Sequence, residues 1–91
     1  MIQEYEITEL IPQRAPIIMV DRILEVTGNE AVTSFTIMED NIFLDDNGIL
    51  KESGIIENIA QSASAMYGYE HRCHGGTKAP VAVSYTHLTL P

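Results

Sequence analysis

The sequence is poor in cysteine, in basic residues and in long apolar runs. Its single cysteine, Cys73, cannot form an internal disulfide, which fits a reducing cytosol. Five basic residues stand against 13 acidic ones, and the net charge of −8 disfavours binding to nucleic acid or to anionic lipid. The apolar run from Pro16 to Val20 is far shorter than the roughly 20 residues that a membrane span needs. We therefore expect a cytoplasmic protein without nucleic-acid or membrane partners.

The longest periodic pattern runs from Ser53 to Tyr69 and predicts one long, mostly buried helix in a single small domain. Apolar residues recur there at three- and four-residue spacing, as on one face of a helix. The expected buried face consists of Ile55, Ile56, Ile59, Ala60, Ala63, Met66 and Tyr67. Ser53 is expected to cap the first turn, and Gly54 to let another segment approach closely. The helix is expected to end by His71, in a loop that reaches Gly76.

The remaining patterns predict a β-hairpin and short connecting elements. Met19 to Val26 alternates as a strand, Gly28-Asn29 suits a tight turn, and Ala31 to Met38 is rich in β-branched residues. A helical turn is expected before the hairpin. Shorter elements are expected at Ile7 to Ile11 (the helical turn), Ile42 to Leu44 (a brief strand within a loop) and Val81 to Tyr85 (a further strand). The sequence thus predicts an α+β domain.

The end of the chain carries a different signal. Val83 to Pro91 resembles the translated read-through of a sequencing-library adapter, and we exclude it from fold reasoning. The expected organisation is a partial domain over residues 1–82 and a non-native tail over residues 83–91. One hairpin is too little sheet to cover a long helix. We therefore expect the domain to be incomplete at its C-terminus or to be completed by a partner.

Two segments together resemble the β-hydroxyacyl-acyl carrier protein dehydratases, which belong to the hotdog superfamily. Leu10 to Val26 (LIPQRAPIIMVDRILEV) is similar to the opening segment of that family, which ends in a strand with Val-Asp-Arg. Ile55 to Ala65 (IIENIAQSASA) is similar to the start of its central helix, where an acidic residue is followed four positions on by Gln. In this chain those two residues are Glu57 and Gln61.

The resemblance implies a hotdog fold, in which a curved antiparallel sheet wraps around one long central helix and two protomers form a dimer with sites at the interface. The implied reaction removes water from a 3-hydroxyacyl thioester carried on acyl carrier protein, in fatty acid or polyene- and polyketide-type biosynthesis. Glu57 matches the catalytic acid. Gly54 and Ile55 would donate backbone N–H groups to the thioester carbonyl, and Phe43 and Gln61 would also line the substrate. No cofactor is implied.

The chain departs from the family at the catalytic histidine. Ungapped counting from Glu57 places Phe43 where the family has histidine, and no histidine occurs between Met1 and Glu70. His71 follows Glu57 by 14 positions, about 20 Å along a helix, which is too far to share one substrate carbon. Asp45 and Asp46 are weaker candidates for the base.

Simpler interpretations compete with each of these assignments. Glu57 could be a solvated helix position, and the group His71, Cys73 and His74 is better interpreted as a surface loop than as a metal site. Three functions follow: a dehydratase whose base comes from a partner or an unusual carboxylate, a non-catalytic hotdog subunit that binds acyl thioesters or completes a heterodimer, and an acyl thioesterase. The expected partners are an acyl thioester on acyl carrier protein and another hotdog protomer, in a homo- or heterodimer. We expect no metal.

Overall fold

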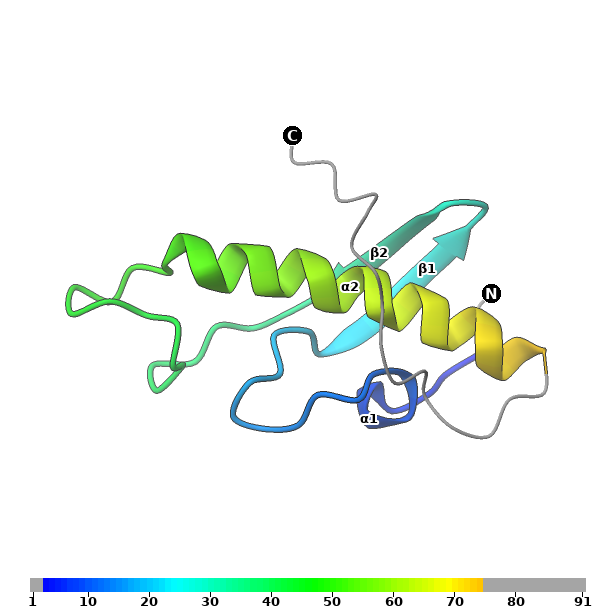
Figure 1. The fold of residues 1–91 in the computed structure, drawn as a ribbon, viewed down its shortest axis with the longest axis horizontal. Helices are drawn as coiled ribbons and strands as arrows, with labels where there is room; N and C mark the ends of the chain where they lie inside the picture. Colours follow the sequence, from blue (N-terminus) through cyan, green and yellow to red (C-terminus); the bar gives the residue numbers. More distant parts are fainter. Residues whose placement is uncertain (1–2, 75–91) are drawn as a thin grey trace.

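The computed structural model describes residues 3–74, which form a hairpin packed against one long helix (Figure 1). The elements follow the order α1 (Ile7–Leu10), β1 (Arg22–Thr27), β2 (Glu30–Ser34) and α2 (Glu52–Cys73). The strands β1 and β2 pair in a two-stranded antiparallel sheet, and both contact α2. Helix α1 packs against α2 as well. This α+β arrangement is compatible with part of a hotdog fold.

The predicted helix is confirmed, with different ends. Helix α2 begins at Glu52, directly after the extended residue Lys51, and ends at Cys73. The prediction that Ser53 caps the helix is wrong, because Lys51 is the capping residue and no side chain caps the first turn. The carboxylate of Glu52 lies in the first turn, where the helix dipole favours a negative charge. Residues 71–73, expected in a loop, form the last turn.

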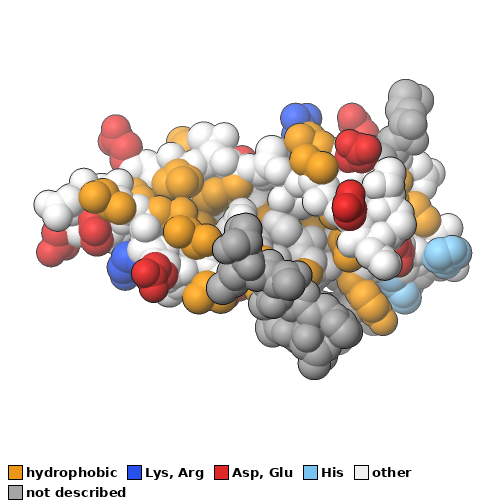
Figure 2. Space-filling model, turned by 90° about the horizontal axis from the view of Figure 1, so that it is seen from above, with side chains coloured by type: hydrophobic (Ala, Val, Ile, Leu, Met, Phe, Trp, Pro, Cys, Tyr) orange, Lys and Arg blue, Asp and Glu red, His pale blue; other side chains and the backbone are white. Residues whose placement is uncertain are grey.

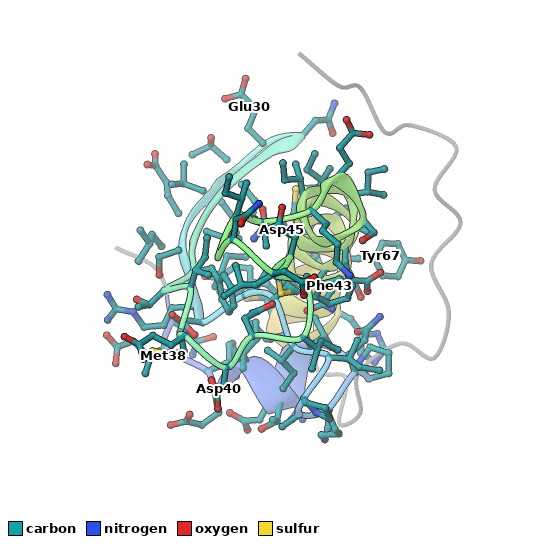
Figure 3. All side chains as sticks on the ribbon, turned by 90° about the vertical axis from the view of Figure 1, so that its left-hand side faces the viewer. Glu30, Met38, Asp40, Phe43, Asp45 and Tyr67 are labelled. Atoms are coloured by element: carbon teal, nitrogen blue, oxygen red, sulfur yellow. The ribbon has the colours of Figure 1, made fainter. Side chains whose placement is uncertain are left out.

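The face of α2 that packs inward agrees with the predicted one only in part: Ala60 is buried and Met66 packs against the core, as expected, but other members are not buried. Its buried residues are small or polar: Gly54, Ala60, Gln61, Ser64, Ala65 and Gly68. Three members of the predicted apolar face are exposed instead, by 46% at Ile55, 49% at Ile56 and 59% at Tyr67. Figure 3 shows Tyr67 on the side of the helix away from the sheet, and Figure 2 shows hydrophobic side chains on the surface seen from above. Small residues face inward because neighbouring segments approach the helix backbone closely.

The hairpin is confirmed, with shorter strands than predicted. Its register pairs Thr27 with Glu30 and Arg22 with Ser34, around the expected turn at Gly28-Asn29. Gly28 has a φ of 55°, the left-handed conformation that glycine adopts without steric cost. Residues 19–21 and 35–38 lie outside the strands.

A β-bulge at Leu24 changes which side chains of β1 face the helix. The pairing skips from Ile23 to Glu25, so strict alternation is interrupted between them. Ile23 is therefore buried and Val26 packs against the same core, although strict alternation predicts them on opposite faces. Leu24 is 43% exposed. The bulge thus supplies two inward apolar side chains from a short strand.

The N-terminal segment packs on the second half of α2. Leu10 and Ile11, at the end of α1, are fully buried and join Ile23 and Ala65 in the core. The short helical turn predicted over Ile7 to Ile11 is confirmed, because α1 spans Ile7–Leu10 with a capping box formed by Glu6 and Glu9. Two carbonyl groups of α1 accept hydrogen bonds, that of Thr8 from the Arg14 side chain and that of Glu9 from the Arg72 side chain.

An aromatic contact extends this packing to the C-terminal turns of α2. The rings of Tyr5 and Tyr69 meet edge to face, with centroids 5.9 Å apart. Desolvation raises the pKa of the Tyr5 hydroxyl above its ordinary value of 10.0, and the nearby Cys73 thiol adds to this effect. At neutral pH the hydroxyl therefore keeps its proton and donates to Oε1 of Gln3, at 2.9 Å.

The expected strand at Val81 to Tyr85 and the expected non-native tail over residues 83–91 lie outside the described residues. Within residues 3–74, no helix is long and apolar enough to cross a membrane.

Candidate functional site

Two amide side chains of α2 bind the backbone of the segment that leads into β1. The Asn58 amide donates to the Met19 carbonyl oxygen at 2.6 Å, and the Gln61 amide donates to the Ile17 carbonyl oxygen at 2.8 Å. The Met19 N–H donates in return to Oε1 of Gln61 at 2.6 Å. Met19 and Gln61 are fully buried. These bonds fix the segment from Ile17 to Met19 against one face of the helix.

Glu57 lies on that face, and its carboxylate is hydrogen-bonded to the same amide group of Gln61. Nε2 of Gln61 donates to Oε1 of Glu57 at 2.9 Å. The two residues are four positions apart, one helical turn, so their side chains meet on one face. Glu57 is partly buried, between the fully buried Gln61 and solvent. A carboxylate held in this way is a group that can give or accept a proton at a defined position.

Phe43 packs directly over the first turn of α2. A Cβ atom built on Gly54 would lie 2.6 Å from Cβ of Phe43 and 2.8 Å from Cδ1 of Leu50, so only glycine fits there. The backbone holds this contact, because Lys51 N–H donates to the Phe43 carbonyl at 2.8 Å and Leu44 bridges to Leu50. Figure 3 labels Phe43 near the end of the helix that faces the viewer. The close approach expected at Gly54 is confirmed.

Gly54→Ala is therefore expected to destabilise the protein by about 1–2 kcal/mol, because Phe43 must move to admit the methyl group. Alanine in place of glycine inside a helix otherwise stabilises by up to about 1 kcal/mol. Chemical denaturation measures the difference, and Ser53→Ala, at the exposed preceding residue, is the control. A gain in stability for Gly54→Ala would show that Phe43 does not rest on the helix.

The predicted backbone donors are engaged within the helix. The N–H groups of Gly54 and Ile55 both donate to the Lys51 carbonyl, at 2.9 and 3.2 Å. In the part of the chain that the structure describes, the N–H groups of Glu52 and Ser53 make no backbone hydrogen bond outside the helix. They also have no acceptor within the helix, because they stand in its first turn. Donation by Gly54 and Ile55 to a substrate stays a prediction, and the open N–H groups lie one to three positions earlier.

A small apolar recess lies beside the first half of α2. Its volume is about 250 Å³, and it opens between the helix and the chain that continues from β2. The lining residues are Met19, Thr33, Phe35, Ile37, Leu50, Ile55 and Asn58. Ile55 and Asn58 flank Glu57 on the helix, so the recess adjoins the same turn. Of the predicted site residues, the structure pairs Glu57 with Gln61 and Gly54 with Phe43, and it places Ile55 at the recess.

No described histidine lies near Glu57. His71 belongs to the same straight helix, 14 residues on, which corresponds to about 21 Å. The carboxylate of Asp45, considered as a base, closes a turn by accepting from the N–H groups of Asn47 and Ile49 at 2.8 and 2.9 Å. Within residues 3–74, no three His, Cys, Asp or Glu side chains come together as metal ligands.

Sequence reasoning missed Asn58 as a member of this site. The available signal was the spacing of two amide residues, Asn58 and Gln61, on a helix face whose other inward residues are small. A long amide on such a face has to find hydrogen-bond partners in the segment that packs there.

The hairpin, the long helix and its held carboxylate define a small α+β protein compatible with part of a hotdog-type dehydratase. Comparison with protein families agrees with that class: residues 5–83 match the ApeP-like family model, described as ApeP dehydratase. Because the match spans most of the chain, the protein belongs to the ApeP-like dehydratase family. Neither a curated protein nor a solved structure matches the chain. The family supports a dehydratase-like function and lyase-type activity at the family level.

Proposed function

We propose that the protein acts on a 3-hydroxyacyl thioester carried on acyl carrier protein and removes water to give a 2-enoyl thioester, with Glu57 as the acid. The observation that carries this proposal is the Glu57 carboxylate, which is fixed by Gln61 at 2.9 Å in a partly buried position. The adjoining apolar recess suits part of an acyl chain. Membership of a dehydratase family supports the reaction class.

The reaction requires two proton transfers. A base removes a proton from C2 of the substrate, the electrons form the C2–C3 double bond, and the C3 hydroxyl leaves as water after it receives a proton from Glu57. The open N–H groups in the first turn of α2 would stabilise negative charge on the thioester oxygen. The proton that the base takes is later returned to Glu57 through solvent, which completes the cycle.

We propose that the base comes from a second hotdog protomer. Within residues 3–74 the two histidines, His71 and His74, lie at the far end of α2 from Glu57. A dimer interface could bring a partner histidine to the first half of the helix, where no described base stands. This protomer can be another copy of the chain or a different hotdog protein.

A second candidate is a non-catalytic subunit that binds acyl thioesters or completes a heterodimer. The observation that favours it is that Phe43 packs on Gly54. Ungapped counting from Glu57 places this phenylalanine where the resemblance would put a histidine. A phenylalanine cannot move a proton, so this protomer would bind the acyl thioester or complete a heterodimer whose other chain holds the histidine.

The test supplies a 3-hydroxyacyl thioester on acyl carrier protein to the purified protein, alone and mixed with a hotdog protomer that carries the family histidine. Mass spectrometry follows the acyl group. We expect the acyl group to lose one water in the mixture, whether or not it does so with the protein alone. Activity in the mixture alone identifies the chain as a contributing subunit. Release of free thiol without loss of water would replace dehydration with thioester hydrolysis.

A further inference from the structure

The recess beside the first half of α2 has an open end and a closed end. Its mouth lies at the start of the helix, where Ile37 is 47% exposed and Ile55 is 46% exposed. Thr33 and Asn58 line the recess further along the strand and the helix, and both are partly buried. The recess therefore runs inward along α2 from the first turn of the helix.

A pair of hydroxyl groups joins the sheet to the helix at the inner end of the recess. Oγ1 of Thr33 and Oγ of Ser62 are 2.8 Å apart and share a hydrogen bond. Ser62 follows Asn58 by one helical turn, so it continues the helix face that lines the recess. On the other wall, Thr33, Phe35 and Ile37 alternate toward the helix, and Thr33 is the innermost of them. The hydroxyl pair therefore stands across the closed end.

The surroundings of this hydroxyl pair are mostly apolar. Apart from Asn58, the other side chains that line the recess are apolar. On the far side of the pair, Ala31 lies two positions before Thr33 on the strand and packs against the core. Ala65 lies three positions after Ser62 on the helix and is fully buried in the core. An alkyl chain in the recess would thus meet two hydroxyl groups between one apolar region and the next.

Two effects stop an alkyl chain at the hydroxyl pair. Non-bonded carbon atoms pack at about 3.5–4.0 Å from their neighbours. A methylene group therefore cannot enter between two oxygen atoms that are 2.8 Å apart. Separation of the two hydroxyl groups would break their hydrogen bond and leave both groups facing methylene, which is unfavourable away from water.

We propose that Thr33 and Ser62 form an end stop of the recess and so determine the longest acyl chain that the site takes. This inference rests on the proposed function, which places part of the acyl chain in the recess. The thioester end of the chain lies at the mouth, beside the open N–H groups in the first turn of α2, and the alkyl end points toward Ser62. From Ile55 to Ser62 the helix rises about 10 Å, which is the depth available to the chain.

The first measurement uses the unchanged protein and a series of 3-hydroxyacyl thioesters of N-acetylcysteamine, each longer than the last by two carbons. Isothermal titration calorimetry gives the Kd of each compound. While the chain lies within the recess, each step should lower Kd about tenfold, because more apolar surface leaves water. Once the chain reaches the end stop, further carbons should leave Kd unchanged or raise it. A Kd that falls through the whole series, or that does not depend on chain length, would overturn the inference.

Two variants open the end stop. Thr33→Ala removes a hydroxyl and a methyl group, and Ser62→Ala removes only a hydroxyl at a position where alanine favours the helix. Both should move the longest favourable chain upward by one step and lower the Kd of that longer compound about tenfold. The matched control is Thr36→Ala, the same substitution at an exposed residue of the same segment that does not line the recess. An unchanged limit in both opened variants, or the same shift in Thr36→Ala, would overturn the inference.

This design separates the end stop from the proposed reaction, because Kd is measured without turnover. If the limit moves as expected and no dehydration is found with any chain length, the proposed function fails and the end stop stands. If dehydration is found and neither opened variant moves the limit, the end stop fails and the proposed function stands.

Discussion

Replacement of Glu57 with glutamine is expected to lower the rate of dehydration about 10²- to 10⁴-fold, the usual contribution of a general acid or base. The substitution is nearly isosteric. A glutamine oxygen at position 57 can still accept the hydrogen bond that Gln61 now donates to Oε1 at 2.9 Å. The packing of the helix is therefore kept, and what is lost is the group that exchanges the proton. The measurement is the initial rate of water loss from a 3-hydroxyacyl thioester, in whichever mixture is active.

A matched control separates proton transfer from net charge. Glu70→Gln removes the same charge from the same helix at an exposed residue 13 positions away. It is expected to change the rate less than about twofold, because surface charges at that distance are largely screened. An unaltered rate in Glu57→Gln would show that the acid of this site is another group. An equal fall in Glu70→Gln would point to a general effect of charge.

Replacement of Gly68 with alanine is expected to destabilise the protein by about 3 kcal/mol, because the new methyl group meets backbone atoms that cannot rotate away. A Cβ atom there would lie 2.0 Å from the Leu10 carbonyl oxygen and 2.8 Å from its carbon. The clash separates α1 from α2. A loss of this size is a large share of the roughly 5–10 kcal/mol that stabilises a small domain.

The midpoint and slope of urea denaturation measure this effect. Gly54→Ala serves as a graded comparison, since its overlap with Cβ of Phe43, at 2.6 Å, is less severe than the overlap of Gly68→Ala with the Leu10 carbonyl. The expected order of loss is Gly68→Ala, then Gly54→Ala, with Ser53→Ala close to zero. An increase in stability for Gly68→Ala, as at an exposed helical glycine, would show that Leu10 does not contact the helix at this point.

Much of the fold could be predicted from the sequence, since local patterns determine local structure. The turn at Gly28-Asn29 and the long run of helix-forming residues after Glu52 are local signals. The inward face of α2 was not predictable in the same way. Apolar spacing identified a stripe through Ile55 and Tyr67, both of which are exposed, whereas the close approach of Leu10 and Phe43 selects glycine where these residues meet the helix.

In the candidate site, too, the local contacts could be predicted and the long-range contacts could not. The spacing of Glu57 and Gln61 predicts that they are neighbours on the helix, and the structure joins them by a hydrogen bond. Their connection to Met19 could not be predicted, because it joins residues 42 positions apart through backbone atoms that leave no mark in the sequence. The bulge at Leu24 was hidden for a similar reason, since an inserted residue shifts the alternation without a distinctive side chain.

The docking of the N-terminal segment on the last turns of α2 has a consequence for how the chain folds. Gln3 N–H bonds to the Tyr69 hydroxyl across 66 positions, and Arg72 bonds to the Glu9 carbonyl across 63. Closing a loop of about 60 residues raises the free energy by about 3.6 kcal/mol, because the chain loses entropy before these contacts form. On the ribosome, α1 has no docking surface until α2 has emerged. Helix α1 is made before its docking surface and is therefore among the last elements to reach its final place, and Leu10 and Ile11 stay exposed to other chains until then.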